Sequence, residues 1–367
     1  MEELDKEFNG LEGLEVFFEG DSLPPNALAE TNTKWMNKIG SEKYSVDKVF
    51  EIMGKGTLAD GTSIKLGAGD TGLGKVHLQT GGDLEGATIK NFTRDRDAYD
   101  NHSHGSHVTC MMAAKPQGSG ITGLASDAKV YHAKVLSNSG SGTGRGILNG
   151  VQWLADQGCK VISLSLGGGG FSDEANRLYK KLDEQGILVF ASIGNSGQGG
   201  ERGGYPGRYD TTAGIGAVNF NDTVARFSSE SEDVDLTGYG VDIYSCGWRG
   251  YTGMSGTSMS CPYVAGNAVR HIGYFDRLGI KVKNMAHYYE LVKPAIKDLS
   301  TPGKDRYFGR GIIVDSLLID HYGIPEDKPK DPVIPVPVPV DPIDCPVHEV
   351  VGSLTIDGVE YDISKKK

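Results

Sequence analysis

The chain has 367 residues, a formal net charge of -11 and 53 glycines. The negative charge argues against nucleic acid or an anionic membrane surface as the main partner, because both would repel the protein. No apolar run reaches the roughly 18 residues of a membrane-spanning helix, and the acidic N-terminus lacks the basic and then apolar pattern of a secretory signal. We therefore expect a cytoplasmic protein without a membrane or nucleic-acid partner.

The five cysteines are odd in number, widely spaced and without a Cys-x-x-Cys pair. This pattern predicts neither a disulfide framework nor a structural zinc site. Reduced thiols are the expectation in a cytoplasm. The cysteines are Cys110, Cys159, Cys246, Cys261 and Cys345.

Along the chain, residues 1–34 form an acidic N-terminal segment that we interpret as too irregular for a domain of its own, because Pro24-Pro25 breaks any regular element. Strand and helix patterns then alternate, which predicts a three-layer α/β sandwich with a mainly parallel central sheet and a ligand site at the carboxyl ends of its strands. The predicted elements are, in order, a strand at 62–66, a helix at 105–114, a strand at 129–136, a helix at 145–157, a strand at 160–166, a helix at 173–185, a strand at 187–191, and helices at 257–272 and 285–297.

The C-terminal part differs in composition. Residues 325–346 alternate proline with valine and isoleucine, which predicts a stiff linker. Residues 347–367 follow as a short extension with a β-hairpin pattern, two strands joined by Asp357-Gly358. Because a lone hairpin is marginal in water, we expect it to dock on the main body, add a strand to another sheet, or be removed.

Two motifs carry a carboxylate and an imidazole. Asp70 ends the first strand between Gly69 and Gly72, where a sharp turn exposes the carboxylate; the alternative is an aspartate that binds only its own turn. His104 stands before a helix, where the positive helix end favours the neutral imidazole that a general base needs. Together with His102 and His107 it is alternatively a metal cluster, although no acidic or cysteine ligand at suitable spacing supports that reading.

Two further motifs carry an amide and a hydroxyl. Asn195 follows an apolar strand among glycines, and it is either a turn former or a donor for an oxyanion. Ser258 follows Gly256 at the start of a helix, where backbone N–H groups favour negative charge, with Pro262 expected in the first turn. The alternative is a serine that only caps the helix.

These motifs resemble the three signature blocks of the subtilisin-like serine peptidases, in the same Asp, His, Ser order. The blocks are Asp70-Thr71-Gly72, His104-Gly105-Ser106-His107-Val108 and Gly256-Thr257-Ser258-Met259. The resemblance covers roughly residues 35–272 and implies a catalytic domain at 35–324. The short N-terminal segment and the missing signal are most similar to the intracellular or phage-type members, so an association with a virion is a further hypothesis.

The resemblance implies a serine endopeptidase of broad specificity that acts on protein or peptide substrates through an acyl-enzyme. His104 would take the proton of Ser258, Asp70 would stabilise the imidazolium, and Asn195 would bind the oxyanion. Extended substrate would bind as an added strand. The implied peptide-binding residues are Gly140, Ser141 and Gly142 on one side, Ser165, Leu166 and Gly167 on the other, and Gly194 next to Asn195.

The chain also departs from the family pattern. Cys110 and Cys261 replace small residues on neighbouring helices, and we interpret them as small buried hydrophobes, with a redox-sensitive pair as the alternative. The family implies structural calcium and no organic cofactor. The loop at 115–120 offers few carboxylates, so residues 205–210 are the second candidate.

Residues 12–25 are predicted to lie over the cleft as an inhibitory segment that is removed on maturation. A catalytically silent peptide-binding or scaffold protein on the same fold is the alternative function. A lipase or esterase is disfavoured, because the chain lacks a Gly-x-Ser-x-Gly elbow. The sequence does not indicate whether the protein forms a homo-oligomer.

Overall fold

The computed structural model describes residues 14–16, 35–41, 43–116, 121–325, 349–356 and 359–365. The chain divides into two compact units, Met1–Pro325 and Glu326–Lys367, and each is described by itself. Among the described residues, no helix is long and apolar enough to cross a membrane.

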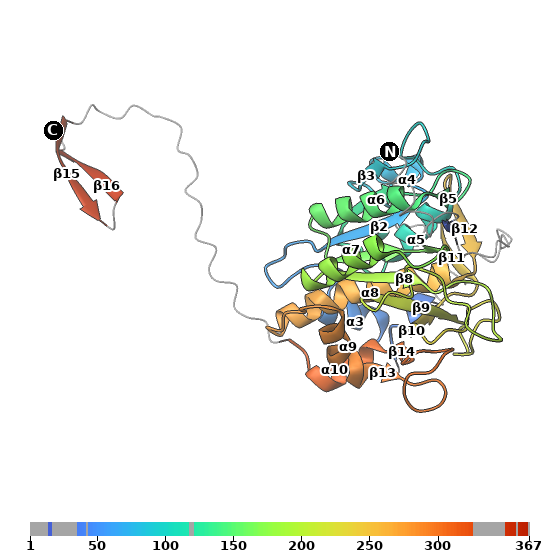
Figure 1. Ribbon diagram of the computed structural model, residues 1–367. Helices are drawn as coiled ribbons and strands as arrows, with labels where there is room; N and C mark the ends of the chain where they lie inside the picture. The colour runs from blue at the N-terminus through green and yellow to red at the C-terminus, as the bar shows by residue number, and fades with distance from the viewer. Residues whose placement is uncertain are drawn as a thin grey trace. The chain divides into compact units, whose positions relative to one another are not determined.

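A seven-stranded sheet forms the centre of the first unit, in the order β10-β9-β8-β6-β2-β4-β3 (Figure 1). All of its neighbouring strands are parallel. Most of its inner strands are buried along their whole length, as expected for a parallel sheet covered on both faces. The strands are β2 (Lys65–Asp70), β3 (Thr88–Asn91), β4 (Lys129–Lys134), β6 (Val161–Leu164), β8 (Leu188–Ser192), β9 (Thr212–Val218) and β10 (Val234–Tyr239).

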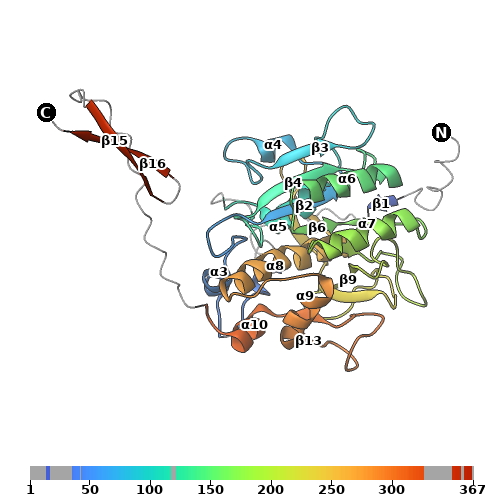
Figure 2. The same cartoon turned by 60° about the vertical axis from the view of Figure 1, so that its left-hand side comes forward.

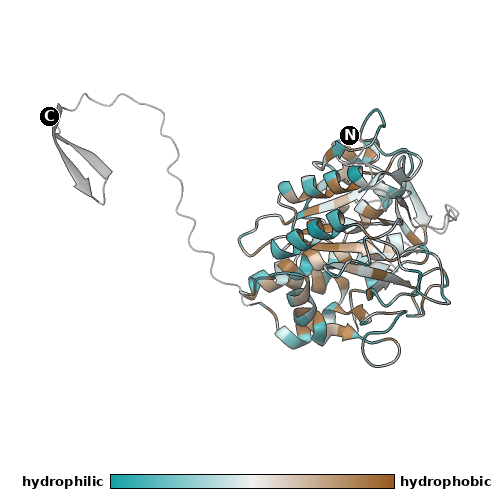
Figure 3. Ribbon diagram, viewed as in Figure 1, coloured by the Kyte–Doolittle hydropathy of each residue, from teal (hydrophilic) through white to brown (hydrophobic). Residues whose placement is uncertain are grey.

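Helices cover both faces of this sheet (Figure 2). Apolar residues of α6 and α7 form one core with the sheet, and those of α3, α5, α8, α9 and α10 form the other. The helices α6 and α7 bury one side against the sheet and carry polar residues on the other, as amphipathic helices do (Figure 3), whereas all residues of α5 are buried. The helices are α3 (Val46–Met53), α4 (Lys75–Leu78), α5 (His104–Ala113), α6 (Gly144–Asp156), α7 (Asp173–Glu184), α8 (Thr257–Arg277), α9 (Met285–Val292) and α10 (Asp315–Tyr322).

The predicted three-layer sandwich is therefore confirmed, while several boundaries were wrong. The first strand begins at Lys65 instead of residue 62, because Ser63 pairs with Thr57 outside the sheet. The predicted strand at 160–166 is two strands, β6 and the separate β7 (Leu166–Gly167). The predicted helix at 285–297 ends at Val292, since the following turn contains a proline and is a 3-10 helix that leads into β13 (Ile296–Lys297).

Four smaller sheets complete the fold. One is three-stranded, with β1 (Leu14–Val16) between β5 (Ser141–Gly142) and β7. Two hairpin-like pairs join β11 (Ile243–Cys246) to β12 (Tyr251–Met254), and β13 to β14 (Ile312–Ile313). The fourth is the C-terminal unit.

The second unit is an antiparallel hairpin of β15 (Glu349–Ile356) and β16 (Val359–Lys365), as the sequence predicts. The pairing ends with Ile356 opposite Val359. The turn at 357–358 and the proline-rich linker beyond Pro325 lie outside the described residues.

Candidate active site

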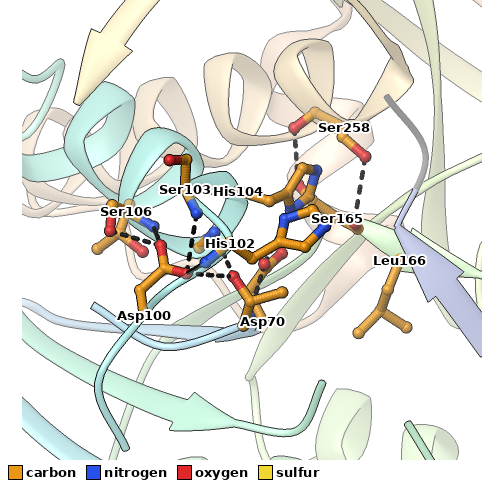
Figure 4. A network of polar contacts seen from close by, with 12 residues as sticks. Asp70, Asp100, His102, Ser103, His104, Ser106, Ser165, Leu166 and Ser258 are labelled. Carbon is orange, nitrogen blue, oxygen red and sulfur yellow. Dashed lines mark hydrogen bonds and ion pairs between the residues drawn. The ribbon is translucent and has the colours of Figure 1, made fainter. Parts of the chain in front are cut away.

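Three elements bring the predicted catalytic side chains together. Asp70 is the last residue of β2, His104 is the first residue of α5, and Ser258 is the second residue of α8. Figure 4 shows the three side chains gathered in one place. They therefore lie where a carboxyl end of the parallel sheet meets two helix N-termini, the usual ligand position of such sheets.

Asp70 and His104 form a buried hydrogen-bonded pair. His104 Nδ1 lies 2.8 Å from Asp70 Oδ1, and the Thr71 N–H donates to the same oxygen over 2.7 Å. Burial opposes ionisation of Asp70, but the charge of His104, the hydrogen bond from His104 and the charge of His132 hold its pKa below the usual value. The carboxylate is thus suited to fix one imidazole tautomer and to stabilise an imidazolium.

Ser258 is held by reciprocal contacts with Ser165. The Ser258 hydroxyl donates to the Ser165 carbonyl over 3.1 Å, and the Ser165 hydroxyl donates to the Ser258 carbonyl over 2.7 Å. The second contact has a local cause. Pro262 is the sixth residue of α8 instead of lying in its first turn, and since proline has no N–H it cannot donate to the Ser258 carbonyl four residues earlier.

The amide of Asn195 is oriented by the start of α8. Its Oδ1 accepts the Thr257 N–H over 3.0 Å and the Thr257 hydroxyl over 2.8 Å. The amide nitrogen Nδ2 is buried and has no hydrogen-bond partner among the described residues. Gly194, with a φ of 124°, makes the turn that lets Asn195 reach this position after β8. The result is a fixed donor near Ser258 that is available to an anionic oxygen.

The predicted peptide-binding residues flank a strand that already occupies the space between them. β1 is antiparallel to both neighbours, with Leu14 opposite Gly142 and Glu15 opposite Ser141 and Gly167. On the β7 side, Val16 then lies opposite Leu166. Gly140, with a φ of 81°, forms the turn before β5 and takes no part in this pairing. The C-terminal end of β1 is therefore directed along β7 toward Ser165.

The histidine cluster does not form a metal site. His107 Nε2 donates to the Ile243 carbonyl over 3.0 Å, and burial followed by the charge of His104 lowers its pKa to about 3. Burial, followed by the charge of His104, also lowers the pKa of His102. Within the described ranges, the one group of three ligands close enough for a metal is His77 with two cysteines, and those cysteines are bonded to each other.

The expectation of reduced thiols throughout was wrong. Cys110 of α5 and Cys246 of β11 form a disulfide with a Cα–Cα distance of 5.9 Å. They are 136 residues apart in sequence, so no local spacing motif could have revealed the pair. Cys261 does not pair with Cys110; it is a buried free thiol whose pKa is raised to about 12 by burial. This agrees with a small hydrophobe at that position.

The side chains near residues 205–210 offer only part of the oxygen ligands that calcium needs. The pocket there is lined by Asp183, Asp210, Asp233 and Asp235, and arginine and lysine side chains already pair with the last two. Since calcium requires about six to eight oxygen ligands, Asp183 and Asp210 alone would not complete a site for the ion. The other candidate, the loop at 115–120, lies partly outside the described residues. No step of the reaction below depends on calcium.

Several residues around Asp70 were missed by the sequence analysis. His132 accepts the Gly72 N–H at Nε2 over 3.1 Å, and burial lowers its pKa to about 4. Lys134, which lies opposite Asp70 in the sheet, donates to the Thr71 carbonyl and to Asn138 Oδ1. Asp100 accepts bonds from both sides of the site. The polar residues at alternate positions of β4 were the signal that could have indicated His132 and Lys134.

A buried aspartate–histidine pair, a serine at a helix N-terminus and a fixed amide donor on a parallel α/β sheet define a serine hydrolase. The model of the subtilase family matches residues 61–311. The chain therefore belongs to the subtilase family, and it is a subtilisin-type serine endopeptidase.

Individual relatives agree with this assignment. Subtilisin DY of Bacillus licheniformis is 34% identical over 259 residues, which cover 69% of this chain and 89% of the relative. Subtilisin E of Bacillus subtilis (strain 168) is 32% identical over 257 residues, or 69% of this chain and 65% of the relative. An intracellular serine protease of Paenibacillus polymyxa is 36% identical over 217 residues, or 56% of this chain and 65% of the relative.

Proposed function

We propose that the chain cleaves peptide bonds with Ser258 as nucleophile, His104 as general base and Asp70 as the group that orients His104. The bond between His104 Nδ1 and Asp70 is the observation that carries this proposal, because it leaves the other ring nitrogen as the basic atom. Asn195 adds the donor for the oxyanion, since its buried Nδ2 has no partner among the described residues.

The reaction follows from these positions. His104 Nε2 removes the proton of the Ser258 hydroxyl as Oγ bonds to the carbonyl carbon of the substrate. Asn195 Nδ2 and the Ser258 backbone N–H donate to the resulting oxyanion. His104 then passes its proton to the leaving amine, and the C–N bond breaks to give an acyl-enzyme. Water, deprotonated by His104, attacks the ester carbonyl and releases the acid while the proton returns to Ser258.

Substrate would bind as an extended strand in the position that β1 occupies. Ser141 and Gly142 on one side and Leu166 and Gly167 on the other already pair with a strand there. Such recognition depends mainly on main-chain hydrogen bonds, which tolerate many side chains. Broad specificity for protein and peptide substrates is the consequence.

By the same geometry, the N-terminal segment would inhibit the enzyme until it is removed. Residues 14–16 cannot share the space between β5 and β7 with a substrate strand. Residues 1–13 and 17–34 lie outside the described residues, so the support comes from the three residues of β1 alone.

The location of the protein is a separate proposal. The similarity to an intracellular serine protease supports a cytoplasmic enzyme. The disulfide between Cys110 and Cys246 argues the other way, because disulfides persist mainly in oxidising compartments. Thiol mapping of the protein in freshly lysed cells, with alkylation during lysis, decides between a reduced and an oxidised site. Virion association stays a hypothesis.

The decisive experiment uses a fluorophosphonate probe, peptide mass spectrometry to find the adduct, and casein digestion. We expect one adduct on Ser258 and no casein cleavage by Ser258→Ala. An adduct that appears only after limited removal of a terminus would support a zymogen. No adduct in any form would contradict the proposed roles and favour a catalytically silent, peptide-binding protein on this fold.

A further inference from the structure

The mechanism above does not use Asp100, a carboxylate that is only 1% exposed. Its Oδ1 accepts the His102 N–H over 2.8 Å, the Ser103 N–H over 3.0 Å and the Thr71 hydroxyl over 3.0 Å. Its Oδ2 accepts the Ser106 N–H over 3.0 Å and the Ser106 hydroxyl over 2.6 Å. Figure 4 shows Asp100 at the centre of this network, between the end of β2 and the start of α5.

On one side, the network reaches the catalytic aspartate through Thr71. The Thr71 N–H donates to Asp70 over 2.7 Å, while its hydroxyl donates to Asp100 and accepts the Gly105 N–H over 2.8 Å. Gly105 directly follows His104 in the chain. Thr71 thus links Asp70 to the backbone beside His104, and the side chains of Asp70 and His104 are the two that must meet.

On the other side, Asp100 replaces a missing helix cap. Ser103 is the N-cap residue of α5, but it has a φ of 85° and makes no capping bond with its side chain. Its hydroxyl instead accepts the Trp248 N–H over 3.1 Å. The first N–H groups of a helix need acceptors, and Asp100 supplies one to Ser106 from outside the helix. The position of His104, the first residue of α5, therefore depends on this carboxylate.

We propose that Asp100 is a positioning residue for catalysis: it holds the start of α5 against the end of β2, so that His104 faces both Asp70 and Ser258. This inference rests on the catalytic roles proposed above. Asp100 is not a catalytic residue, because these hydrogen bonds join it to backbone and hydroxyl groups on either side of the site.

The electrostatics are consistent with this role. Five donors surround the carboxylate, so its two oxygens are well satisfied in the buried position. An asparagine amide in the same place would keep one acceptor oxygen. Its NH2 group would replace the other oxygen and face N–H and O–H groups that are themselves donors. The substitution Asp100→Asn should therefore loosen the start of α5 while changing the side-chain volume very little.

The test compares Asp100→Asn with the unmodified chain, using peptide hydrolysis per titrated active site. We expect kcat to fall by about 10- to 100-fold, because a displacement of about 1 Å at the reacting groups has effects of this size. KM should change by less than about threefold, since the peptide-binding strands β5 and β7 are untouched. Asp305→Asn is the matched control: Asp305 accepts the N–H groups of Tyr307 and Phe308 in a loop away from the site.

A second readout separates positioning from general loss of structure. The proton on His104 Nδ1, which faces Asp70, should give a low-field nuclear magnetic resonance signal. In Asp100→Asn this signal should shift or broaden, although the melting temperature remains well above that of the assay. The conservative variants Thr71→Val and Ser106→Ala each remove one hydroxyl contact of Asp100. Each variant should lose part of the activity. When either is combined with Asp100→Asn, the loss should be smaller than the sum of the two separate losses in activation free energy.

The outcomes are distinct. If neither the full-length chain nor a form with a terminus removed reacts with a fluorophosphonate at Ser258, the proposed function fails, and this inference with it. If the unmodified chain reacts, and Asp100→Asn has an unchanged kcat and His104 signal, only the positioning role is overturned. Should Asp100→Asn fail to fold, Thr71→Val and Ser106→Ala decide alone: full activity in both would overturn the proposal.

Discussion

Asn195 shows how neighbouring groups can prepare a single residue for its proposed role. Both contacts to Thr257 use the amide oxygen, and the amide nitrogen has no partner among the described residues. Such a donor gains most when negative charge develops on the substrate oxygen, because it is already oriented and shielded from water. Its effect should fall on the chemical step more than on binding.

We therefore predict that Asn195→Leu lowers kcat by about 100- to 1,000-fold with a small change in KM, a magnitude taken from removal of an oxyanion donor in subtilisin, a relative, and not worked out for this chain. Steady-state kinetics with a chromogenic peptide measure both constants. A mainly raised KM would contradict the prediction and would make Asn195 a ground-state binding residue. Thr257→Val, which keeps the Thr257 N–H but removes the hydroxyl, should have a smaller effect in the same direction.

At this scale, the sequence indicated the candidate residues that stand in short motifs. It missed those whose position near the site depends on which strands pair in the sheet. Asp70, His104 and Ser258 each stand beside glycine or at a helix start, and that context is visible in the sequence. Lys134 and His132 gain their roles because β4 lies next to β2 in the sheet. Which strands become neighbours depends on tertiary packing, which no local pattern contains.

Among the elements, β1 is the one on which the proposed inhibition depends. It is paired on both edges, so its removal exposes the edges of β5 and β7 together. The pairing uses the backbone and requires N–H groups at its centre. Proline at position 15 would remove one such N–H and fix φ at a value poorly suited to a central strand.

We expect Glu15→Pro to raise the initial rate of peptide hydrolysis of the freshly purified full chain severalfold, because the proposed inhibition depends on this pairing. Glu15→Ala keeps the N–H group and is the matched control. Intact mass must be recorded before each assay, so that chain cleavage is not mistaken for release of the strand. Equal rates for Glu15→Pro, Glu15→Ala and the unmodified chain would contradict an inhibitory role of β1.

The disulfide connects two other elements, α5 and β11. It closes a loop of 136 residues, and it restricts the unfolded chain more than the folded one. We predict that Cys110→Ala/Cys246→Ala lowers the free energy of unfolding by about 2–4 kcal/mol, the usual range for such a crosslink. Urea unfolding in the Ser258→Ala background, which avoids self-digestion, measures this difference.

A reductant provides the control for the crosslink. It should destabilise the Ser258→Ala protein by a similar amount and leave the double-alanine variant in the same background unchanged. Insensitivity of both proteins to the reductant would show that the disulfide contributes no stability. The free thiols of Cys159 and Cys261 are present in both proteins, so their effects cancel in the comparison.

On the scale of the whole molecule, the sequence correctly predicted the layers of sheet and helices. It did not predict the contacts between segments that are far apart in the chain. Alternating strands and helices led to the three-layer sandwich, and α5, α6 and α7 begin within one residue of their predicted positions. The strands β9 and β10 escaped prediction, because glycine and aspartate interrupt their apolar pattern. The disulfide and the pairing of β1 also connect distant parts of the chain, where local periodicity gives no signal.

The buried histidines give the whole molecule a particular dependence on pH. Burial lowers the pKa of His132 to about 4 and, followed by the charge of His104, lowers that of His107 to about 3. In the unfolded chain both would titrate near the ordinary value of 6.5. Between pH 6.5 and about 4 the unfolded chain therefore binds more protons than the folded one, so stability must fall as the pH falls through this window.

We predict that the free energy of unfolding of the Ser258→Ala protein is constant above about pH 7 and decreases by a few kcal/mol toward pH 4.5, since each pKa unit corresponds to about 1.4 kcal/mol. His132→Gln in this background should lose the contribution of one proton to that slope, because glutamine can still accept the Gly72 N–H but does not titrate. Urea unfolding at half-unit pH steps gives both slopes. Carboxylates such as Asp70, whose pKa is lowered, add their own loss only at lower pH. An identical slope in the two proteins between pH 6.5 and 4.5 would mean that His132 is already protonated in the folded enzyme.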